Sequence, residues 1–160
     1  MNEPDLQFDE YGFLTPYNLI PADMNTLKRV FVDGFPISTT RQRLFARFED
    51  FTANLRELLP DRYTQWVDGS FVSQKQNPND IDVLTFVEYN LYNQQRKQFD
   101  ALNSWHKLQA QEVQAFFVTV YPENHRQRHL YESDRVQWLF DWGRTRSLPR
   151  RRKGIIELTF

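Results

Sequence analysis

The sequence predicts an α/β (α+β) fold in which a small mixed β-sheet is flanked by helices. Three observations lead to this class. Residues 41–59 carry a long amphipathic pattern that is typical of a helix. Several short runs rich in Val, Ile and Phe are typical of buried strands. The two kinds of segment alternate along 160 residues, a length that fits one domain covering residues 1–160.

The first 24 residues predict an extended N-terminal arm, because Pro4, Pro16 and Pro21 oppose a helix there. The arm also carries apolar side chains that we expect to pack on the domain, namely Phe8, Phe13, Leu14, Leu19 and Ile20. Residues 26–35 follow as a short mixed segment.

A long helix is expected next. The hydroxyls of residues 38–40 can accept hydrogen bonds from the free amides at a helix start. From Arg41 onward, apolar residues recur at spacings of three and four, which predicts one buried face. This face consists of Leu44, Phe45, Phe48, Phe51, Leu55, Leu58 and Leu59. Pro60 then ends the helix.

The rest of the chain alternates between strands and helices. Strands are expected at residues 63–68, 81–87, 113–121 and 155–160. Helices are expected at residues 90–108 and 130–140, and Gly143 ends the second of them.

The composition excludes several classes of protein. The chain has no Cys, so it has neither a disulfide framework nor a thiolate zinc site. No apolar stretch approaches the ~20 residues of a membrane span. The first five residues include two acidic side chains, Glu3 and Asp5, and no basic one, which does not fit a signal peptide. We therefore expect a cytoplasmic protein with no membrane partner.

A basic segment lies between Gly143 and Gly154. It contains no acidic residue and six cations, namely Arg144, Arg146, Arg150, Arg151, Arg152 and Lys153. Two interpretations stay open: a solvated surface, or an anion site for a triphosphate or an RNA backbone.

The run from Trp66 to Val83 carries the strongest candidate chemistry. A predicted strand leads directly into Gly69 and Ser70, and a second predicted strand opens with Asp80-Ile81-Asp82. Glycine allows a phosphate to approach the backbone closely, and the serine hydroxyl adds a donor. In a strand, residues two apart face the same side, so the two carboxylates converge. Such a pair suits Mg²⁺, which takes carboxylate and phosphate oxygens.

This arrangement resembles the signature of the nucleotidyltransferase fold of the DNA polymerase β superfamily. It is similar to the small bacterial members of this superfamily, including the minimal nucleotidyltransferases of toxin–antitoxin loci. The wider chain is similar to a family of uncharacterised bacterial nucleotidyltransferase-like proteins. That similarity rests on Leu19-Ile20-Pro21, Thr40-Arg41, Gly69-Ser70-Phe71-Val72, Pro78-Asn79-Asp80-Ile81-Asp82-Val83 and Lys153-Gly154-Ile155-Ile156-Glu157-Leu158.

The resemblance implies a Mg²⁺-dependent transfer of a nucleoside monophosphate from an NTP, with ATP favoured, to a protein or RNA hydroxyl. It implies that Asp80 and Asp82 are the catalytic metal ligands and that Gly69 and Ser70 hold the phosphates. Four cations could also reach the triphosphate, namely Lys75, Arg144, Arg146 and Lys153. The resemblance further implies a toxin–antitoxin or phage-defence setting, with a cognate toxin or antitoxin as a possible partner.

The sequence departs from the superfamily at the third carboxylate. The matching position on the strand at residues 113–121 is Gln114, which has no negative charge. Glu112 lies two residues earlier and is expected to take the catalytic role if the strand extends that far. Without it, the chain would be a catalytically decayed domain that binds a nucleotide or a partner protein. A plain structural protein, in which the motifs are coincidental, is the remaining reading.

Overall fold

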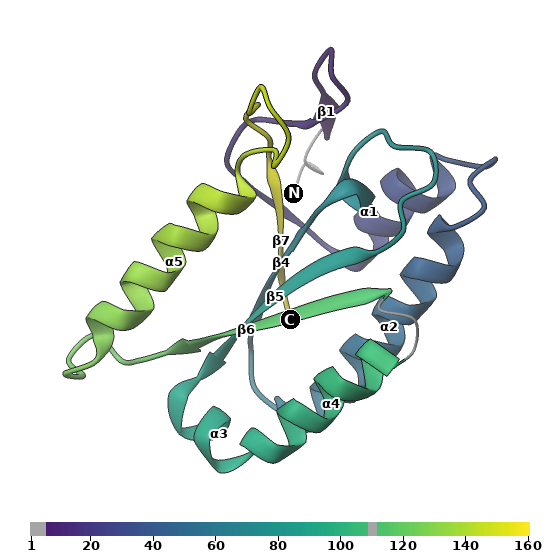
Figure 1. The fold of residues 1–160 in the computed structure, drawn as a ribbon. Coiled ribbons are helices and arrows are strands. Elements are labelled where there is room, and N and C mark those ends of the chain that lie inside the picture. The colour runs from purple at the N-terminus through teal and green to yellow at the C-terminus, as the bar shows by residue number, and fades with distance from the viewer. Residues whose placement is uncertain (1–5, 109–111) are drawn as a thin grey trace.

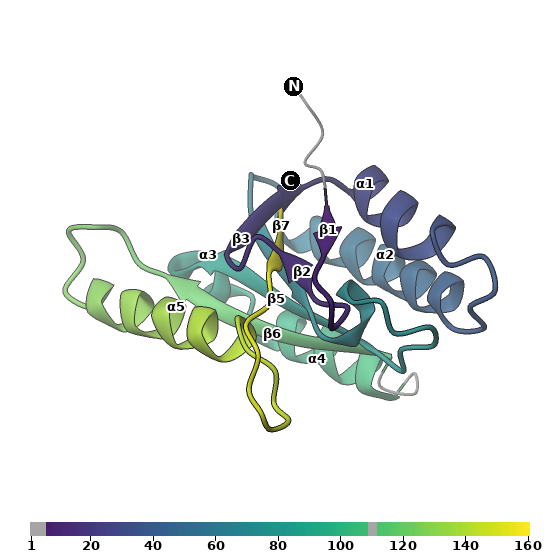
Figure 2. The same cartoon turned by 90° about the horizontal axis from the view of Figure 1, so that it is seen from above.

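The protein is built on a five-stranded mixed sheet with helices on both faces (Figures 1 and 2). The structure, a computed structural model, describes residues 6–108 and 112–160. The strands of the sheet are β3 (Leu19–Ala22), β4 (Thr64–Asp68), β5 (Ile81–Glu88), β6 (Val113–Val120) and β7 (Ile155–Thr159). The predicted fold class is confirmed.

The strand order is β3-β7-β4-β5-β6, and the directions are mixed. β4 is antiparallel to both of its neighbours, β7 and β5, whereas β3 runs parallel to β7 and β6 runs parallel to β5. In this register Asp68 lies opposite Asp82, and Asp82 lies opposite Gln114. Three neighbouring strands therefore bring polar residues to the same end of the sheet.

Helices cover the two faces unequally. Figure 1 shows α5 on one side of the sheet and α1, α2 and α4 on the other. Their bounds, with that of α3, are α1 (Met24–Lys28), α2 (Arg41–Leu58), α3 (Tyr89–Gln94), α4 (Arg96–Leu108) and α5 (Arg128–Trp142). A π-helical turn at Arg29–Asp33 extends α1. No helix within the described ranges combines the length and the apolar character that crossing a membrane requires.

Two hydrophobic cores result from this arrangement. The first lies between the sheet and α1, α2 and α4, and includes the predicted face of α2 from Leu44 to Leu59. The second lies on the face that α5 covers, and its buried members are Trp66, Leu84, Phe86, Val118, Trp142 and Ile155. Successive residues of β5 alternate between the cores, so Ile81 and Val83 enter the first core as predicted.

The N-terminal segment differs from the predicted arm. It forms a small hairpin, β1 (Gln7–Phe8) with β2 (Leu14–Thr15), and then supplies the edge strand β3. Pro21 is compatible with β3 because an edge strand has one side without a partner. Residues 1–5 of the predicted arm lie outside the described residues.

The predicted helix at residues 90–108 is two helices, since α3 ends before Gln95 and α4 begins after it. The predicted helix at residues 130–140 is longer at both ends and becomes α5. The predicted strands agree with β4, β5, β6 and β7 to within one residue at each end.

Candidate functional site

The site begins where β4 ends. Gly69 follows the strand with a φ of +84°, a region that side chains rarely adopt. A Cβ atom at this position would lie 2.7 Å from Oδ2 of Asp82. Glycine is therefore required on two counts: the backbone turns sharply here, and the Asp82 carboxylate lies against it. Ser70 opens the short 3-10 turn that follows.

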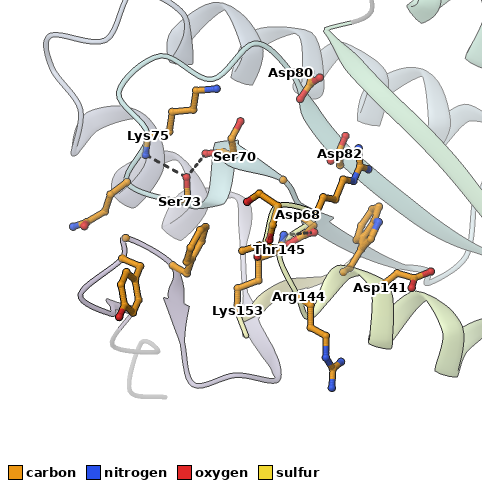
Figure 3. Close-up of a pocket in the computed structure, with 18 of the residues that line it drawn as sticks. Asp68, Ser70, Ser73, Lys75, Asp80, Asp82, Asp141, Arg144, Thr145 and Lys153 are labelled. Carbon is orange, nitrogen blue, oxygen red and sulfur yellow. Dashed lines mark hydrogen bonds and ion pairs between the residues drawn. The ribbon is translucent and has the colours of Figure 1, made fainter. Parts of the chain in front are cut away.

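Asp82 lies on the neighbouring strand β5, beside this turn, and Asp80 lies just before that strand. Asp82 is in β5 and is buried at 8% exposure, while Asp80 directly precedes the strand and is half-buried. Figure 3 shows both of them with Ser70 around the same pocket. Burial and the nearby carboxylates of Asp80 and Asp68 raise the pKa of Asp82 to about 6.

Gln114 joins this group from β6. Its Nε2 donates a hydrogen bond of 2.9 Å to Oδ2 of Asp80. The amide therefore lies beside the carboxylate pair, where the resemblance to nucleotidyltransferases leads us to expect a third carboxylate. It holds Asp80 in place without adding negative charge.

Asp68 is a third carboxylate at this end of the sheet. It is the last residue of β4, is 3% exposed and forms an ion pair of 2.6 Å with Nζ of Lys153 (Figure 3). Burial raises the pKa of Asp68, and Lys153 opposes that shift. Lys153 thus neutralises a charge that would otherwise add to those of Asp80 and Asp82.

These residues line an open pocket of about 810 Å³. Its lining includes nine charged side chains: the carboxylates of Glu10, Asp68, Asp80, Asp82 and Asp141, and the cations of Lys75, Arg144, Arg146 and Lys153. Carboxylates outnumber cations among them. Side-chain charge alone therefore does not favour a polyphosphate here, and an added cation would reverse that balance.

The six predicted nucleotide-binding residues all line this pocket, but they are not equally placed. Gly69 lies against the carboxylate of Asp82, and Ser70 follows it, while the cations Lys75 and Arg146 are exposed. Lys153 is paired with Asp68. Figure 3 shows Arg144 pointing away from Asp80 and Asp82, and its guanidinium lies 4.0 Å from the ring of Phe140.

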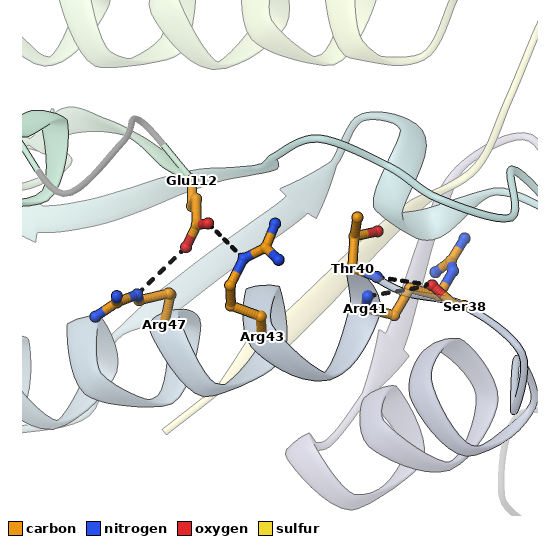
Figure 4. A network of polar contacts seen from close by, with 6 residues as sticks. All are labelled: Ser38, Thr40, Arg41, Arg43, Arg47 and Glu112. Atoms are coloured by element: carbon orange, nitrogen blue, oxygen red, sulfur yellow. Dashed lines mark hydrogen bonds and ion pairs between the residues drawn. The ribbon is translucent and has the colours of Figure 1, made fainter.

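Glu112 lies elsewhere, contrary to the expectation for a third carboxylate. Its side chain accepts hydrogen bonds from Nε of Arg43 at 2.6 Å and Nε of Arg47 at 3.3 Å, both on α2 (Figure 4). The reason is that β6 begins at Val113, so the alternation that aims Gln114 at the pocket does not extend back to Glu112. Glu112 is not among the residues that line the pocket.

A buried arginine supports the loop of the site. Arg41, at the start of α2, is 0% exposed. Its guanidinium donates to four backbone carbonyls, those of Phe31, Phe71, Ser73 and Lys75, at 2.5 to 2.9 Å. Burial lowers the pKa of Arg41 to about 10. Three of its four acceptors belong to residues 71–75, so Arg41 fixes the backbone that follows Gly69 and Ser70.

The sequence interpretation missed the roles of Asp68 and Arg41, and it also missed Asp141 and Thr145, although it named Arg144, Arg146 and Lys153 from the loop after α5. Asp68 carries a signal in hindsight, because it precedes Gly69 and an antiparallel pairing of the two strands puts it opposite Asp82. Arg41 carries no such signal, since one cation at a helix start is ordinary. Asp141 and Thr145 reach the pocket only through the placement of α5.

The donor set is compatible with Mg²⁺. Asp80 and Asp82 offer hard carboxylate oxygens, and burial together with the charge of Asp80 raises the pKa of Asp82. Within the described ranges, no three His, Cys, Asp or Glu side chains form a metal cluster. An ion held by this pair would therefore take further ligands from phosphate and water.

Comparison with known proteins adds one family. Neither the curated proteins nor the solved structures give a match to this chain. One family model matches residues 6–159, which includes every residue of the site described above. The chain belongs to DUF6932, a family of unknown function.

Proposed function

We propose that the protein is a Mg²⁺-dependent nucleotidyltransferase that moves a nucleoside monophosphate from an NTP to a hydroxyl group. One observation carries this proposal: Asp80 and Asp82 line one open pocket together with Gly69 and Ser70, and the Asp82 carboxylate lies against Gly69. The resemblance of these motifs to the DNA polymerase β superfamily supports the same reading.

Each residue of the pocket has a role in this proposal. Gly69 leaves the backbone free of a Cβ, and the Ser70 hydroxyl can donate to a phosphate oxygen. Lys75 and Arg146 are exposed cations that would bind the outer phosphates. Lys153 neutralises the charge of Asp68 through their ion pair, so Asp68 would not be a metal ligand.

Asp80 and Asp82 would hold Mg²⁺, and Gln114 would orient Asp80 through its hydrogen bond. The ion would neutralise phosphate charge and favour the ionised form of the attacking hydroxyl. The acceptor oxygen forms a bond to the α-phosphorus, the bond to the bridging oxygen breaks, and pyrophosphate leaves. The proton of the acceptor hydroxyl is released to water.

A second candidate is a domain that binds a nucleotide or a partner without transfer. Gln114 favours it, because an amide can neither accept the acceptor proton nor add negative charge to the metal set. In this second candidate the pocket still binds its ligand, but no nucleoside monophosphate is transferred.

A transfer assay tests the proposal. The protein is incubated with Mg²⁺ and each α-labelled NTP in turn, together with lysate that supplies protein and RNA acceptors. We expect label on a macromolecule with the wild type and none with Asp80→Asn/Asp82→Asn. The double variant Asp100→Asn/Asp134→Asn removes the same charge at two exposed helix positions and should label as the wild type does.

Two results would oppose transfer. Absence of label with a folded wild type and a competent lysate would favour the binding-only domain. Equal label with wild type and the Asp80→Asn/Asp82→Asn variant would mean that another protein in the lysate performs the transfer.

A further inference from the structure

We propose that the surface beside the pocket, where the acceptor of the transfer would approach, binds a single-stranded nucleic acid. The binding surface is a set of three arginines and three aromatic side chains beside the pocket. We call it the arginine–aromatic surface, and it consists of Tyr11, Tyr17, Phe140, Arg144, Arg151 and Arg152. A role of this surface in nucleotidyl transfer rests on the proposed function, whereas its binding of a single-stranded nucleic acid does not.

Two segments that are far apart in the sequence build this surface. The N-terminal segment at residues 9–18 lies beside the basic segment at residues 144–154, as Figure 1 shows. Backbone hydrogen bonds join them: Gly154 N donates to Leu14 O at 2.8 Å, and Ile155 N donates to Asn18 O at 3.0 Å. The side chain of Arg152 adds a bond of 3.1 Å to Tyr17 O. The surface is therefore held by the fold itself.

Each arginine of the surface lies over an aromatic ring. The guanidinium carbon is 3.4 Å from the ring centre for Arg151 on Tyr11, 4.0 Å for Arg144 on Phe140 and 5.5 Å for Arg152 on Tyr17. The rings remain open to solvent, with Tyr11 52%, Tyr17 38% and Phe140 48% exposed. Exposed rings and guanidinium planes are the groups on which unpaired bases stack.

Asp9 holds the backbone of Tyr11 and the side chain of Tyr17. The Asp9 carboxylate accepts hydrogen bonds from Tyr11 N at 2.9 Å, Phe13 N at 3.0 Å and the Tyr17 hydroxyl at 2.8 Å. These three hydrogen bonds occupy the Asp9 carboxylate within the N-terminal segment. Two other carboxylates lie near the surface, Glu10 and Asp141, and both are exposed.

The charge of the basic segment favours a polyanion. No acidic residue occurs between positions 142 and 156, while six cations do. Arg150 and Arg152 are exposed, and Arg151 is half-buried under its stacking contact. An array of guanidinium groups can contact successive phosphates of a strand, and aromatic rings alone would not select an anion.

The surface also leads into the pocket. A second groove of about 580 Å³ lies between α5 and the β3 edge, with Tyr17, Phe140 and Arg152 in its lining. Arg144 and Lys153 line both this groove and the candidate pocket. A single-stranded nucleic acid lying along the groove would thus bring its end to the pocket. There its terminal hydroxyl could meet Asp80 and Asp82.

Direct binding of labelled oligonucleotides tests the inference. Fluorescence anisotropy is measured in EDTA and without NTP, so that no transfer can occur. The probes are a 12-nucleotide RNA, a DNA of the same sequence, the corresponding duplex DNA and a 12-residue oligoglutamate. We expect the single strands to bind more tightly than the duplex and the oligoglutamate, with an affinity that falls as salt rises.

Variants assign the binding to the surface. Arg151→Gln/Arg152→Gln and Tyr11→Ser should each weaken binding about tenfold, while Arg151→Lys/Arg152→Lys should lose part of the affinity although it keeps the charge. Arg96→Gln/Lys97→Gln removes two exposed cations from α4 on the opposite side of the sheet, and it should bind as the wild type does. Melting curves identify any variant that fails to fold.

The outcomes are distinct from those of the transfer assay. Binding of the single strands without any transfer would support the surface and oppose the enzyme. Transfer to a protein, with strands bound no better than oligoglutamate, would overturn the surface and keep the enzyme. Equal loss of binding in the α4 control and in Arg151→Gln/Arg152→Gln would also overturn it, because the attraction would then be general charge. A preference for RNA over DNA would support the surface and indicate contacts to the 2′-hydroxyl.

Discussion

Asp82 is a carboxylate in a buried position beside two others, Asp80 and Asp68. This placement raises its pKa from an ordinary 3.8 to about 6. Between these two pH values the folded state holds a proton that the unfolded state has released. The contribution of Asp82 to stability therefore becomes less favourable as pH rises from about 4 to 6, and it stays unfavourable above 6.

Replacing this charge should stabilise the fold when no metal is present. We expect Asp82→Asn in EDTA at pH 7.5 to raise the free energy of unfolding by about 1–3 kcal/mol, since one pKa unit corresponds to about 1.4 kcal/mol. Urea unfolding of both proteins across pH 4 to 8 measures this. The gap should widen from pH 4 to 6 and then stay constant. A gap that is the same at every pH would mean that packing, and not charge, separates the two proteins.

Single residues also show where sequence reasoning reaches its limit. The alternation of a strand correctly predicts that Ile81 and Val83 enter the core. The same rule fails for Glu112, because β6 starts one residue later and Arg43 and Arg47 bind the carboxylate from α2. Those arginines are about 70 residues away in the sequence, so no local pattern reveals them. The pairing of Lys153 with Asp68 has the same long-range origin.

Among the elements, α2 and the four predicted strands could be recognised because each carries its own periodicity. β3 could not, because it is four residues long, contains Pro21 and is defined by its partner β7. The break at Gln95 between α3 and α4 likewise has no glycine or proline to mark it. Elements that depend on tertiary contacts are thus the ones that the sequence alone does not reveal.

The loop after β4 depends on α2 through Arg41. Four carbonyl acceptors surround one buried guanidinium, and lysine cannot reproduce its planar fork. We expect Arg41→Lys to lower the free energy of unfolding by about 2–4 kcal/mol, because buried acceptors lose their donors. Urea unfolding measures the loss. Arg47→Gln removes a half-buried partner of Glu112 and leaves the shorter bond from Arg43 in place, so it should cost less than about 1 kcal/mol. Equal losses in the two variants would show that Arg41 has no special role.

A substitution at the start of β6 tests whether Asp80 and Asp82 bind a metal ion. Gln114→Glu would put a third carboxylate beside Asp80 and Asp82, as the resemblance to nucleotidyltransferases suggests. In EDTA we expect a lower melting temperature than that of the wild type, because like charges are brought together. Mg²⁺ should then raise the melting temperature of the variant more than that of the wild type. Differential scanning calorimetry with and without Mg²⁺ measures both, and Gln98→Glu, at an exposed position of α4 away from the pocket, is the control. A variant that does not respond to Mg²⁺ would indicate that the pair is not a metal site.

At the scale of the whole molecule, the charges are separated. Carboxylates from β4, β5 and α5 gather in the pocket, while three of the six cations of the basic segment lie outside its lining, namely Arg150, Arg151 and Arg152. A nucleoside triphosphate that approaches the pocket therefore meets net repulsion from the carboxylates at the inner end of the pocket. We therefore expect the turn after β4 to hold a triphosphate only when a cation compensates the charges of Asp80 and Asp82.

This separation predicts that nucleotide and metal bind together. ATP with Mg²⁺ should raise the melting temperature, whereas ATP in EDTA should leave it unchanged. A ligand at a hundred times its dissociation constant adds about 2.7 kcal/mol of stability, which a thermal scan resolves. Asp80→Asn/Asp82→Asn should lose the joint effect but should then respond weakly to ATP alone, because the repelling charges are gone. Stabilisation of the wild type by ATP in EDTA would contradict the prediction, since it would mean that the cations Lys75 and Arg146 suffice without a metal.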